Sequence, residues 1–324
     1  MRGQPSRKIM RPSPLAAIDL GSNTVRLLVA SGQGAEFERL LLRQEVTRLG
    51  EALKPGEPFL PAAARRTWKV LEQYRAEAEA LGAGKVVVGA TMAVRQAADG
   101  SDFLARISLE LGFETLLLSG AQEADLTAAG VMTGLKPVPD SALIFDLGGR
   151  STEFILTKKG NALETYSLEI GAVALTETYL LSDPPLDGEV KACRAGVDNI
   201  LRCGFSEWDD KAWRPDELVG TAGTTTTLAA MAQGLNVYRP ELIDNYRLTR
   251  EVLAGLFQRI LALPTIERAL IPGLPRDRAD IIAAGAAGVL EIMDFFNTNS
   301  LIVSDAGLLE GIWLAAAGQR SKRQ

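Results

Sequence analysis

Short apolar runs that end at a turn recur along this chain and predict buried strands. Residues 15–18 are apolar and lead into Asp19, Leu20 and Gly21, and a second apolar run at 25–30 follows a Gly-Ser-Asn-Thr turn. Two apolar runs joined by a tight, glycine-containing turn are typical of a strand–turn–strand unit.

The same pattern returns near the middle of the chain. Residues 142–145 are apolar and end in Asp-Leu-Gly-Gly from Asp146, and residues 151–157 alternate as a second strand. The segment AAIDLGSNTVRLLVA thus echoes ALIFDLGGRSTEFILT. An internal repeat of this kind indicates duplication, with an equivalent hairpin in each half.

Helical spacing alternates with further apolar runs in the rest of the chain. Residues 61–81 place Trp68, Leu71 and Tyr74 at helical spacing behind Pro61, which favours a helix start. The other expected helices are 101–111, 122–132, 187–202, 249–263, 278–296 and 308–317, and the other strands are 85–91, 113–118, 166–170, one ending at 219, and 301–304. Interleaved strands and helices predict an α/β fold with mixed sheets covered on both faces.

The length of 324 residues exceeds what one compact core usually organises. We expect lobe I at residues 12–121, with the C-terminal helix at 308–320 packing back on it, and lobe II at 122–307. The segments 1–11 and 318–324 are basic and are expected to be disordered tails.

Composition excludes several classes of chemistry. The chain has no histidine, which rules out a Ser-His-Asp triad, a His-ligated zinc site and a phosphohistidine intermediate. Its two cysteines exclude a disulfide scaffold or a four-cysteine metal site. Acid–base chemistry must therefore come from Asp, Glu, Lys, Tyr or water.

Net charge and hydropathy limit the classes of partner that the protein could bind. The net charge of −5 argues against nucleic-acid binding, although a locally positive cleft could still hold an anion. No apolar run is long enough to cross a membrane, and the N-terminal pattern does not fit a signal peptide. We therefore expect a cytoplasmic protein with neither nucleic acid nor membrane as partner.

The two hairpin turns are suited to phosphate. Glycine lets backbone N–H donors approach an anion closely, and hydroxyls add further donors. The hydroxyl residues of the two turns are Ser22, Thr24, Ser151 and Thr152. Asp19 and Asp146 end the strands before these turns, where they could orient water or hold a divalent cation. A single Asp-Leu-Gly would be read as a plain turn, but two copies with matched flanks favour a site.

Other candidate groups are weaker when taken alone. The loop from Gly220 to Thr224 joins a strand end to a helix start, where free N–H groups favour anions. Glu123 stands at an expected helix start, and its charge there equally fits a carboxylate that offsets the helix dipole. Arg26, Arg95 and Arg278 equally fit exposed surface charges.

Eight ordered segments together resemble the exopolyphosphatase and guanosine-pentaphosphate phosphatase family. They are AIDLGSNTVRLLV, ATMAVR, SGAQEA, FDLGGRSTEF, SLEIGAVALTE, VGTAGTTTTLA, IPGLPRDRADII and VSDAGLLEGI, from about residue 16 to 313. The resemblance implies two ribonuclease-H-like lobes of the actin, sugar-kinase and heat-shock-chaperone ATPase type, with an interlobe cleft. Analogy with relatives also implies a homodimer.

The resemblance assigns roles to particular residues. Glu123 matches the carboxylate that activates the attacking water, and Asp146 and Glu153 match the acidic pair near a divalent metal such as Mg²⁺, with Asp19 close by. The implied phosphate-binding residues are Gly21, Ser22, Asn23, Thr24 and Arg26 in the first loop, Gly148, Gly149, Ser151 and Thr152 in the second, Gly223 and Thr224 in the third, and the arginines Arg95 and Arg278.

Three positions depart from the family pattern. Arg150 replaces the third glycine of the second loop, and a left-handed backbone there would cost a non-glycine residue roughly 1–2 kcal/mol. Arg150 could contact phosphate or block the pocket. Gln122 replaces a common second glutamate, and Leu309 replaces an arginine.

The resemblance implies Mg²⁺-dependent release of terminal phosphate from inorganic polyphosphate, with Glu123 as general base. Hydrolysis of the 5′ phosphate of guanosine pentaphosphate uses the same groups and remains a second hypothesis. A third, of another class, is a catalytically weakened sensor of polyphosphate or guanosine tetraphosphate, motivated by Arg150. The SGAQEA segment opposes an ATP-dependent sugar kinase.

Overall fold

The computed structural model describes residues 13–33, 36–207 and 214–321, which form two compact units. Unit 1 comprises the described parts of Met1–Leu126 and Leu308–Gln324, and unit 2 is Thr127–Gly307. The boundary lies inside helix α4 (Gly120–Gly134), slightly beyond the position expected from sequence. Helix α12 (Leu308–Ser321) corrects the expected tail, because the chain is helical to Ser321. The rest of the expected tails, 1–11 and 322–324, lies outside the described residues.

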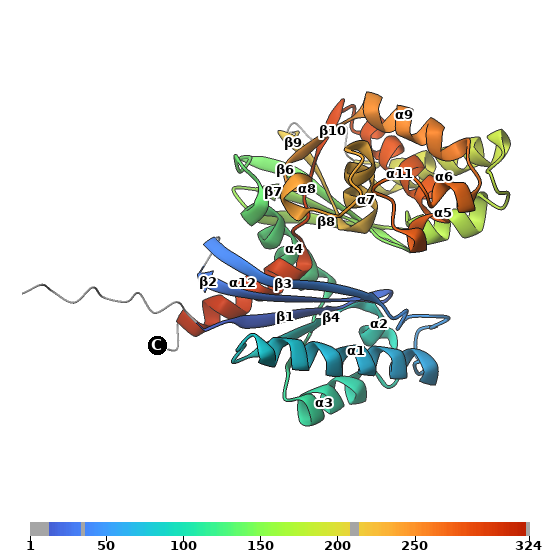
Figure 1. Ribbon diagram of the computed structural model, residues 1–324. Helices are drawn as coiled ribbons and strands as arrows, with labels where there is room; N and C mark the ends of the chain where they lie inside the picture. Colours follow the sequence, from blue (N-terminus) through green and yellow to red (C-terminus); the bar gives the residue numbers. More distant parts are fainter. Residues whose placement is uncertain (1–12, 34–35, 208–213, 322–324) are drawn as a thin grey trace, which may run out of the picture. The chain divides into compact units, whose positions relative to one another are not determined.

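Unit 1 is built on a five-stranded mixed sheet with the order β3-β2-β1-β4-β5. The strands are β1 (Leu15–Leu20), β2 (Thr24–Gln33), β3 (Glu36–Val46), β4 (Val86–Ala90) and β5 (Glu114–Leu117). Its other helices are α1 (Pro61–Ala80), α2 (Met92–Gln96) and α3 (Gly100–Leu111). Helices α1 and α3 cover one face of the sheet, and α12 lies on the other (Figure 1).

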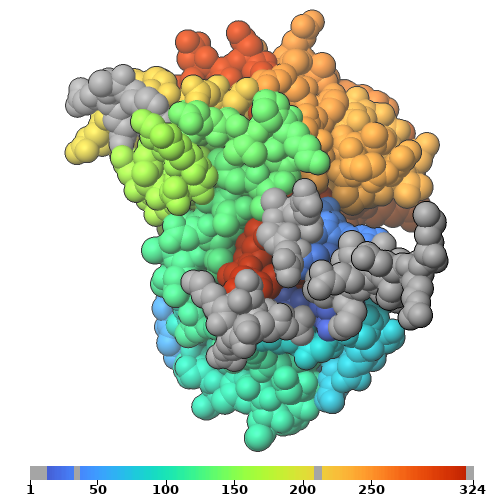
Figure 2. Space-filling model, turned by 90° about the vertical axis from the view of Figure 1, so that its left-hand side faces the viewer, coloured from blue at the N-terminus to red at the C-terminus, as the bar shows by residue number. Residues whose placement is uncertain are grey.

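The alternation of side chains along β1 divides them between two cores. Ala16, Ile18 and Leu20 are buried with the helices α1 to α3, whereas Leu15 and Ala17 are buried with α12. Successive strand residues point to opposite faces, so Asp19 continues the series that faces α12. The red C-terminal helix is visible among the blue and teal segments of unit 1 (Figure 2).

Unit 2 contains a six-stranded sheet with the order β10-β11-β9-β6-β7-β8. Its strands are β6 (Ser141–Leu147), β7 (Thr152–Lys158), β8 (Asn161–Leu168), β9 (Glu217–Thr221), β10 (Tyr246–Thr249) and β11 (Ser300–Val303). Its helices are α5 (Ala172–Tyr179), α6 (Asp187–Gly204), α7 (Ala222–Ala232), α8 (Pro240–Ile243), α9 (Arg250–Leu261), α10 (Thr265–Arg268), the 3₁₀ turn η1 (Arg276–Arg278) and α11 (Ile282–Phe295).

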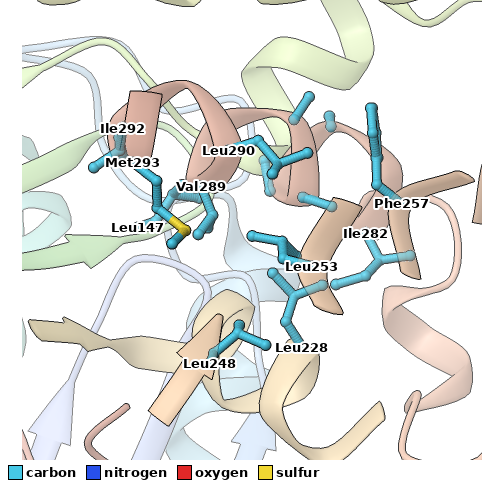
Figure 3. Close-up of a cluster of buried hydrophobic side chains, with 14 of the residues drawn as sticks. Leu147, Leu228, Leu248, Leu253, Phe257, Ile282, Val289, Leu290, Ile292 and Met293 are labelled. Atoms are coloured by element: carbon cyan, nitrogen blue, oxygen red, sulfur yellow. The ribbon is translucent and has the colours of Figure 1, made fainter. Parts of the chain in front are cut away.

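Most side chains in the core of unit 2 around helix α11 are aliphatic, and Phe145, Phe154, Phe205 and Phe257 are buried among them. Leu147 of the sheet, Leu228 of α7 and Leu253 of α9 pack with Val289 and Met293 of α11 (Figure 3). This agrees with the low aromatic content of 6%. Full burial of such side chains stabilises the fold by about 1.5–3 kcal/mol each.

The two sheets share one topology, as the sequence echo predicts. Strands β1, β2 and β3 are antiparallel neighbours and β4 and β5 add in parallel to β1, while β6, β7, β8, β9 and β11 repeat this arrangement. Strand β10 is an antiparallel addition at the edge beside β11. The α/β class with two mixed sheets flanked by helices is therefore confirmed.

Some elements were missed or misplaced by sequence patterns. Strand β3 was not expected because charged residues and three successive leucines break its alternation; as an edge strand it needs only one partner. Helices α2, α5, α8 and α10 and strand β10 were also missed. The helix expected at 278–296 begins only at Ile282, because Arg278 lies in the 3₁₀ turn that follows Pro275. In the part of the chain that the structure describes, no helix combines the length and hydropathy needed to span a membrane.

Candidate active site

The first loop that the sequence predicts to bind phosphate (residues 21–24, the first phosphate loop) lies at the carboxyl end of β1 in unit 1. The amide of Gly21 donates to the carbonyl of Thr24 at 3.1 Å and closes the turn. A Cβ at Gly21 would lie 2.9 Å from that carbonyl oxygen, so the turn needs glycine there. Asp19 on β1 is paired with Arg26 on β2. The strand pairing therefore places the Asp19 carboxylate and the Arg26 guanidinium side by side at the end of the sheet where β1 terminates.

Parallel pairing brings two further candidates to the same edge. Leu20 pairs with Ala90 of β4, and Ala90 pairs with Leu117 of β5. Carboxyl ends of parallel strands meet at one edge, which is where α/β folds place ligands. Arg95 follows β4 on α2, and Glu123 follows β5 in the first turn of α4. Unit 1 thus gathers Asp19, Arg26, Arg95 and Glu123.

Glu123 is held in a defined position. Nη1 of Arg95 lies 3.1 Å from Oε2 of Glu123 and 2.5 Å from the carbonyl oxygen of Leu118. Ser119 and Gln122 cap α4 reciprocally: the amide of Ser119 donates to Oε1 of Gln122 at 2.9 Å, and the amide of Gln122 donates to Oγ of Ser119 at 3.2 Å. Gln122 therefore performs a capping function that glutamate could also perform, which accounts for this departure.

Asp19 carries an unsatisfied acidic oxygen. Its Oδ1 is buried and has no hydrogen-bond partner. Burial raises the pKa of Asp19 to about 7, Arg26 opposes the rise, and Glu123 and Glu310 add to it. A buried carboxylate with neighbouring carboxylates is stable only with a proton or a cation. The unpartnered Oδ1 of Asp19 fits a position where a bound cation, or a water on that cation, would interact with it.

Replacing Asp19 by asparagine should stabilise the metal-free protein. The folded-state pKa is raised, so the stability that Asp19 contributes is present at low pH and is lost as the pH rises through about 7. We expect Asp19→Asn to be more stable than wild type at pH 8 by on the order of 2 kcal/mol, with the difference shrinking toward pH 5. Thermal unfolding in EDTA at both pH values measures this. A variant less stable than wild type at pH 8 would contradict the assigned burial cost.

Glu310 is a residue that sequence reasoning missed. It lies in the first turn of α12, is fully buried, and forms an ion pair with Arg39 at 3.2 Å. The spacing Gly307-x-x-Glu310 repeats Gly120-x-x-Glu123, and both helices follow the last parallel strand of their repeat. That echo was available in the sequence. Leu309 beside it is fully buried in the core against β1 and β2, so this departure serves packing.

The second loop that the sequence predicts to bind phosphate (residues 148–152, the second phosphate loop) lies in unit 2 and repeats the geometry of the first. The amide of Gly148 donates to the carbonyl of Ser151 at 3.0 Å, and Asp146 pairs across the strands with Glu153. Oε1 of Glu153 accepts hydrogen bonds from Oγ of Ser151 at 2.7 Å and from Oγ of Ser167 at 3.0 Å. Two carboxylates therefore face the same side of the sheet at this loop.

The first turn of helix α5 is hydrogen-bonded to this loop. The amides of Ala172, Val173 and Ala174 donate to the carbonyls of Gly148 and Gly149 at 2.9 to 3.1 Å. These bonds satisfy the first N–H groups of the helix and fix the loop backbone. The hydroxyl of Thr152 is fully buried and donates to the carbonyl of Ile170 at 2.5 Å. Its hydrogen is therefore used inside the fold, in contrast to the donor role expected from sequence.

The backbone at Arg150 is not left-handed. Arg150 is not among the residues with positive φ, so the loop accepts a non-glycine residue without left-handed strain. Its side chain is 63% exposed and pairs with Glu177 of α5, with Nη1 and Oε2 2.7 Å apart. The guanidinium is thus directed to α5 in this structure.

The third loop lies next to the second at the sheet edge, because Asp146 pairs in parallel with Thr221. Ala222 has a φ of +66°, an unfavourable left-handed conformation at the start of α7. A Cβ at Gly223 would lie within 2.4 Å of three guanidinium atoms of Arg278, so this glycine lets the arginine lie on the loop. Thr224 is buried, with its methyl group close to Gly285.

Arg268 positions the segment that carries Arg278. It is 2% exposed, and its guanidinium donates to the carbonyls of Ile260, Leu263 and Ala279 at 2.9 to 3.1 Å. Burial lowers the pKa of Arg268. Three backbone acceptors around one buried cation fix the chain immediately after Arg278. Nothing in the sequence pattern distinguished Arg268 from a surface arginine.

The expected metal ligands are divided between the units. Asp19 lies in unit 1, whereas Asp146 and Glu153 lie in unit 2. Within residues 13–33, 36–207 and 214–321, no group of three or more His, Cys, Asp or Glu side chains could by itself hold a metal. Asp146 and Glu153, which are paired across β6 and β7, are oxygen donors of the kind that a hard cation such as Mg²⁺ prefers.

Comparison with known families decides the identity. A model of the Ppx/GppA phosphatase family matches residues 28–319. The chain belongs to the Ppx/GppA phosphatase family. It is 33% identical over 317 residues to exopolyphosphatase 2 of Mycobacterium tuberculosis, covering 94% of this chain and 98% of that protein. The resemblance inferred from the eight segments is thereby confirmed, and the chain is an enzyme of the phosphatase class.

Solved Ppx/GppA structures share the fold. A Ppx/GppA protein of Aquifex aeolicus matches with 31% identity and a TM-score of 0.80, covering 94% of this chain and 99% of the other. An exopolyphosphatase of Cytophaga hutchinsonii matches with 26% identity and a TM-score of 0.82, over 94% and 98% of the two chains. The actin-like α/β architecture of both repeats is therefore that of the Ppx/GppA family.

Proposed function

We propose that this Ppx/GppA phosphatase is an exopolyphosphatase that hydrolyses the terminal phosphoanhydride of inorganic polyphosphate. The observation that carries the proposal is the matched pair of loops. In each loop a glycine N–H donates a hydrogen bond to the carbonyl three residues later, and an aspartate lies two residues before that glycine. Paired loops with backbone donors suit a ligand made of repeated phosphates. The name of the mycobacterial relative points the same way.

Glu123 is the proposed general base. A water held by its carboxylate attacks the terminal phosphorus, the bond to the bridging oxygen breaks, and the proton passes to Glu123. The products are inorganic phosphate and a chain shorter by one unit. Nη1 of Arg95 lies 3.1 Å from Oε2 of Glu123 and also donates to the carbonyl of Leu118, so Arg95 fixes the carboxylate beside the residue that follows β5. A positioned base of this kind contributes about two to four orders of magnitude in rate.

Charge on the phosphates is offset by the remaining residues. Arg26, Arg95 and Arg278 supply fixed positive charge, and the glycine loops orient the reacting phosphoryl group. Asp146 and Glu153, with Asp19, are the proposed ligands of Mg²⁺ or another divalent cation. When bound, that cation neutralises charge that develops on the phosphoryl oxygens. None of these roles needs histidine.

Phosphate release tests the proposal. Long-chain polyphosphate, guanosine pentaphosphate and ATP should be compared with Mg²⁺ at equal phosphate concentration. We expect the highest kcat/KM with polyphosphate. A higher kcat/KM with guanosine pentaphosphate would instead establish the 5′-phosphohydrolase. Tight polyphosphate binding without turnover would establish a sensor. The expected homodimer and cytoplasmic location remain predictions.

The Arg150–Glu177 pair makes a separate prediction. Because the Arg150 backbone is unstrained and its side chain pairs with α5, Arg150→Gly should keep the fold and at least half of the wild-type kcat. Both partners are more than half exposed, so losing the pair should change stability by under about 1 kcal/mol. Steady-state kinetics and thermal unfolding check this. A large rise in kcat would mean that Arg150 obstructs the loop, and a rise in KM that it grips substrate.

A further inference from the structure

The segment after β3 clamps the first phosphate loop through its backbone. The amides of Thr47 and Arg48 both donate to the carbonyl of Asn23, at 3.0 and 2.8 Å, and the amide of Gly50 donates to the carbonyl of Ser22 at 2.7 Å. A Cβ at Gly50 would lie 3.1 Å from Cβ of Ser22. The two segments are therefore in close contact, and the position of one determines that of the other.

Arg48 occupies a strained backbone conformation inside this clamp. Its φ is +51°, in the left-handed region that favours glycine. Thr47 and Leu49 on either side are 1% and 0% exposed and anchor the segment. A glycine at position 48 would relieve the strain without disturbing these anchors. Non-glycine residues in such conformations are frequent at functional sites, so the presence of arginine instead of glycine at position 48 suggests that its side chain has a function.

Arg48 differs from the neighbouring arginines in that its guanidinium is not in an ion pair within the described residues. Arg39 pairs with Glu310, Arg43 with Glu77 and Arg66 with Glu51. Arg48 is exposed, and within the described residues no carboxylate forms an ion pair with it. An exposed cation whose Cα is fixed against a phosphate loop is well placed to attract an anion that approaches that loop.

We infer that Arg48 is a substrate-binding residue that contacts phosphate groups of a polyanionic substrate beside the first loop. This inference rests on the proposed function and deepens it, because it assigns a contact to phosphates other than the one being released. Arg48 contributes to the apparent affinity for the chain, and the hydrolytic step at the terminal phosphate is left to Glu123.

Strain and charge can be separated by substitution. Arg48→Gly removes the cation and relieves the backbone, so the thermal midpoint should equal or exceed that of wild type while KM for long polyphosphate rises about tenfold. kcat should stay within about twofold of wild type. Arg48→Lys keeps the charge, and its KM should stay within about threefold of wild type. The slope of log KM against log salt should also fall for Arg48→Gly, because one phosphate contact is lost.

Lys159 offers a matched control. It is also an exposed cation with a φ of +51°, but it lies in the turn between β7 and β8. Lys159→Gly should raise the thermal midpoint similarly and leave KM and its salt slope unchanged. Wild-type KM in Arg48→Gly, or equal KM increases in the Gly and Lys variants, would overturn the inference.

The proposed function can fail independently. If wild type does not hydrolyse polyphosphate, binding of fluorescently labelled polyphosphate in EDTA replaces KM as the measurement. Weaker binding by Arg48→Gly than by Lys159→Gly would then still support the Arg48 contact. Equal binding by the two variants would refute it.

Discussion

Glu123→Gln should lose at least about two orders of magnitude in kcat for polyphosphate hydrolysis while it remains folded. The amide has nearly the shape of the carboxylate, but it cannot accept a proton from the attacking water at neutral pH. Glu123 and Arg95 are each about one-quarter to one-third exposed, so loss of their ion pair should lower the thermal midpoint by no more than about 3 °C. Initial rates with Mg²⁺ and thermal unfolding provide the two measurements.

Glu251→Gln is the matched control for Glu123→Gln. Glu251 is likewise a glutamate in the first turn of a helix, α9, where it interacts with the helix dipole in the same way, but it is exposed. It should keep wild-type kcat and KM. If Glu123→Gln retained more than about one-tenth of the wild-type rate, Glu123 would not be the base, and another carboxylate would have to be sought. Binding of polyphosphate to Glu123→Gln should persist, since the phosphate loops are intact.

Gly171→Ala should destabilise unit 2 and displace the second phosphate loop. A Cβ at Gly171 would lie 2.3 to 2.4 Å from the backbone C and N of Arg150 and from the carbonyl oxygen of Gly149. Backbone atoms cannot rotate away as a side chain can, so the second phosphate loop must move. We expect a destabilisation of about 1–3 kcal/mol. A displacement of the loop near 1 Å should lower kcat/KM by roughly 100-fold.

Gly188→Ala separates loop distortion from a general effect of adding a methyl group. Gly188 lies in α6, and no atom lies within 4 Å of a Cβ added there. Alanine favours the helix, so this variant should be slightly more stable than wild type and fully active. Wild-type activity in Gly171→Ala would show that the loop position is not critical for turnover, and would remove the support that α5 gives to the proposed site.

Period-two patterns sufficed to place the paired hairpins. The echo between the segments at Asp19 and Asp146 predicted both strand–turn–strand units, and the shared strand order of the two sheets confirms the duplication. This worked because a buried strand must alternate or be fully apolar, and because a tight turn that closes through a glycine amide needs that glycine. Strand β3 was missed because an edge strand can expose charged residues and need not show either pattern.

The roles of single arginines were beyond such patterns. From its sequence context Arg278 fitted an exposed surface charge equally well, yet Gly223 leaves the space in which its guanidinium lies. Arg268 appears in the sequence as one charge among many, but it is buried against three carbonyls. A long charged side chain has the same letter whether it lies in solvent or in a core, and only its surroundings distinguish the two.

By itself, the sequence determined that this chain is a duplicated α/β protein without histidine chemistry and with the ordered segments of a phosphatase family, because strand periodicity, turn glycines and residue inventory are local properties. Only the tertiary structure decided which charges are paired and which are buried: Arg150 lies on Glu177, Oδ1 of Asp19 has no hydrogen-bond partner, and Arg48 is fixed beside the first loop. Burial and pairing depend on residues distant in sequence that folding brings together, and these contacts set the energy of a charge.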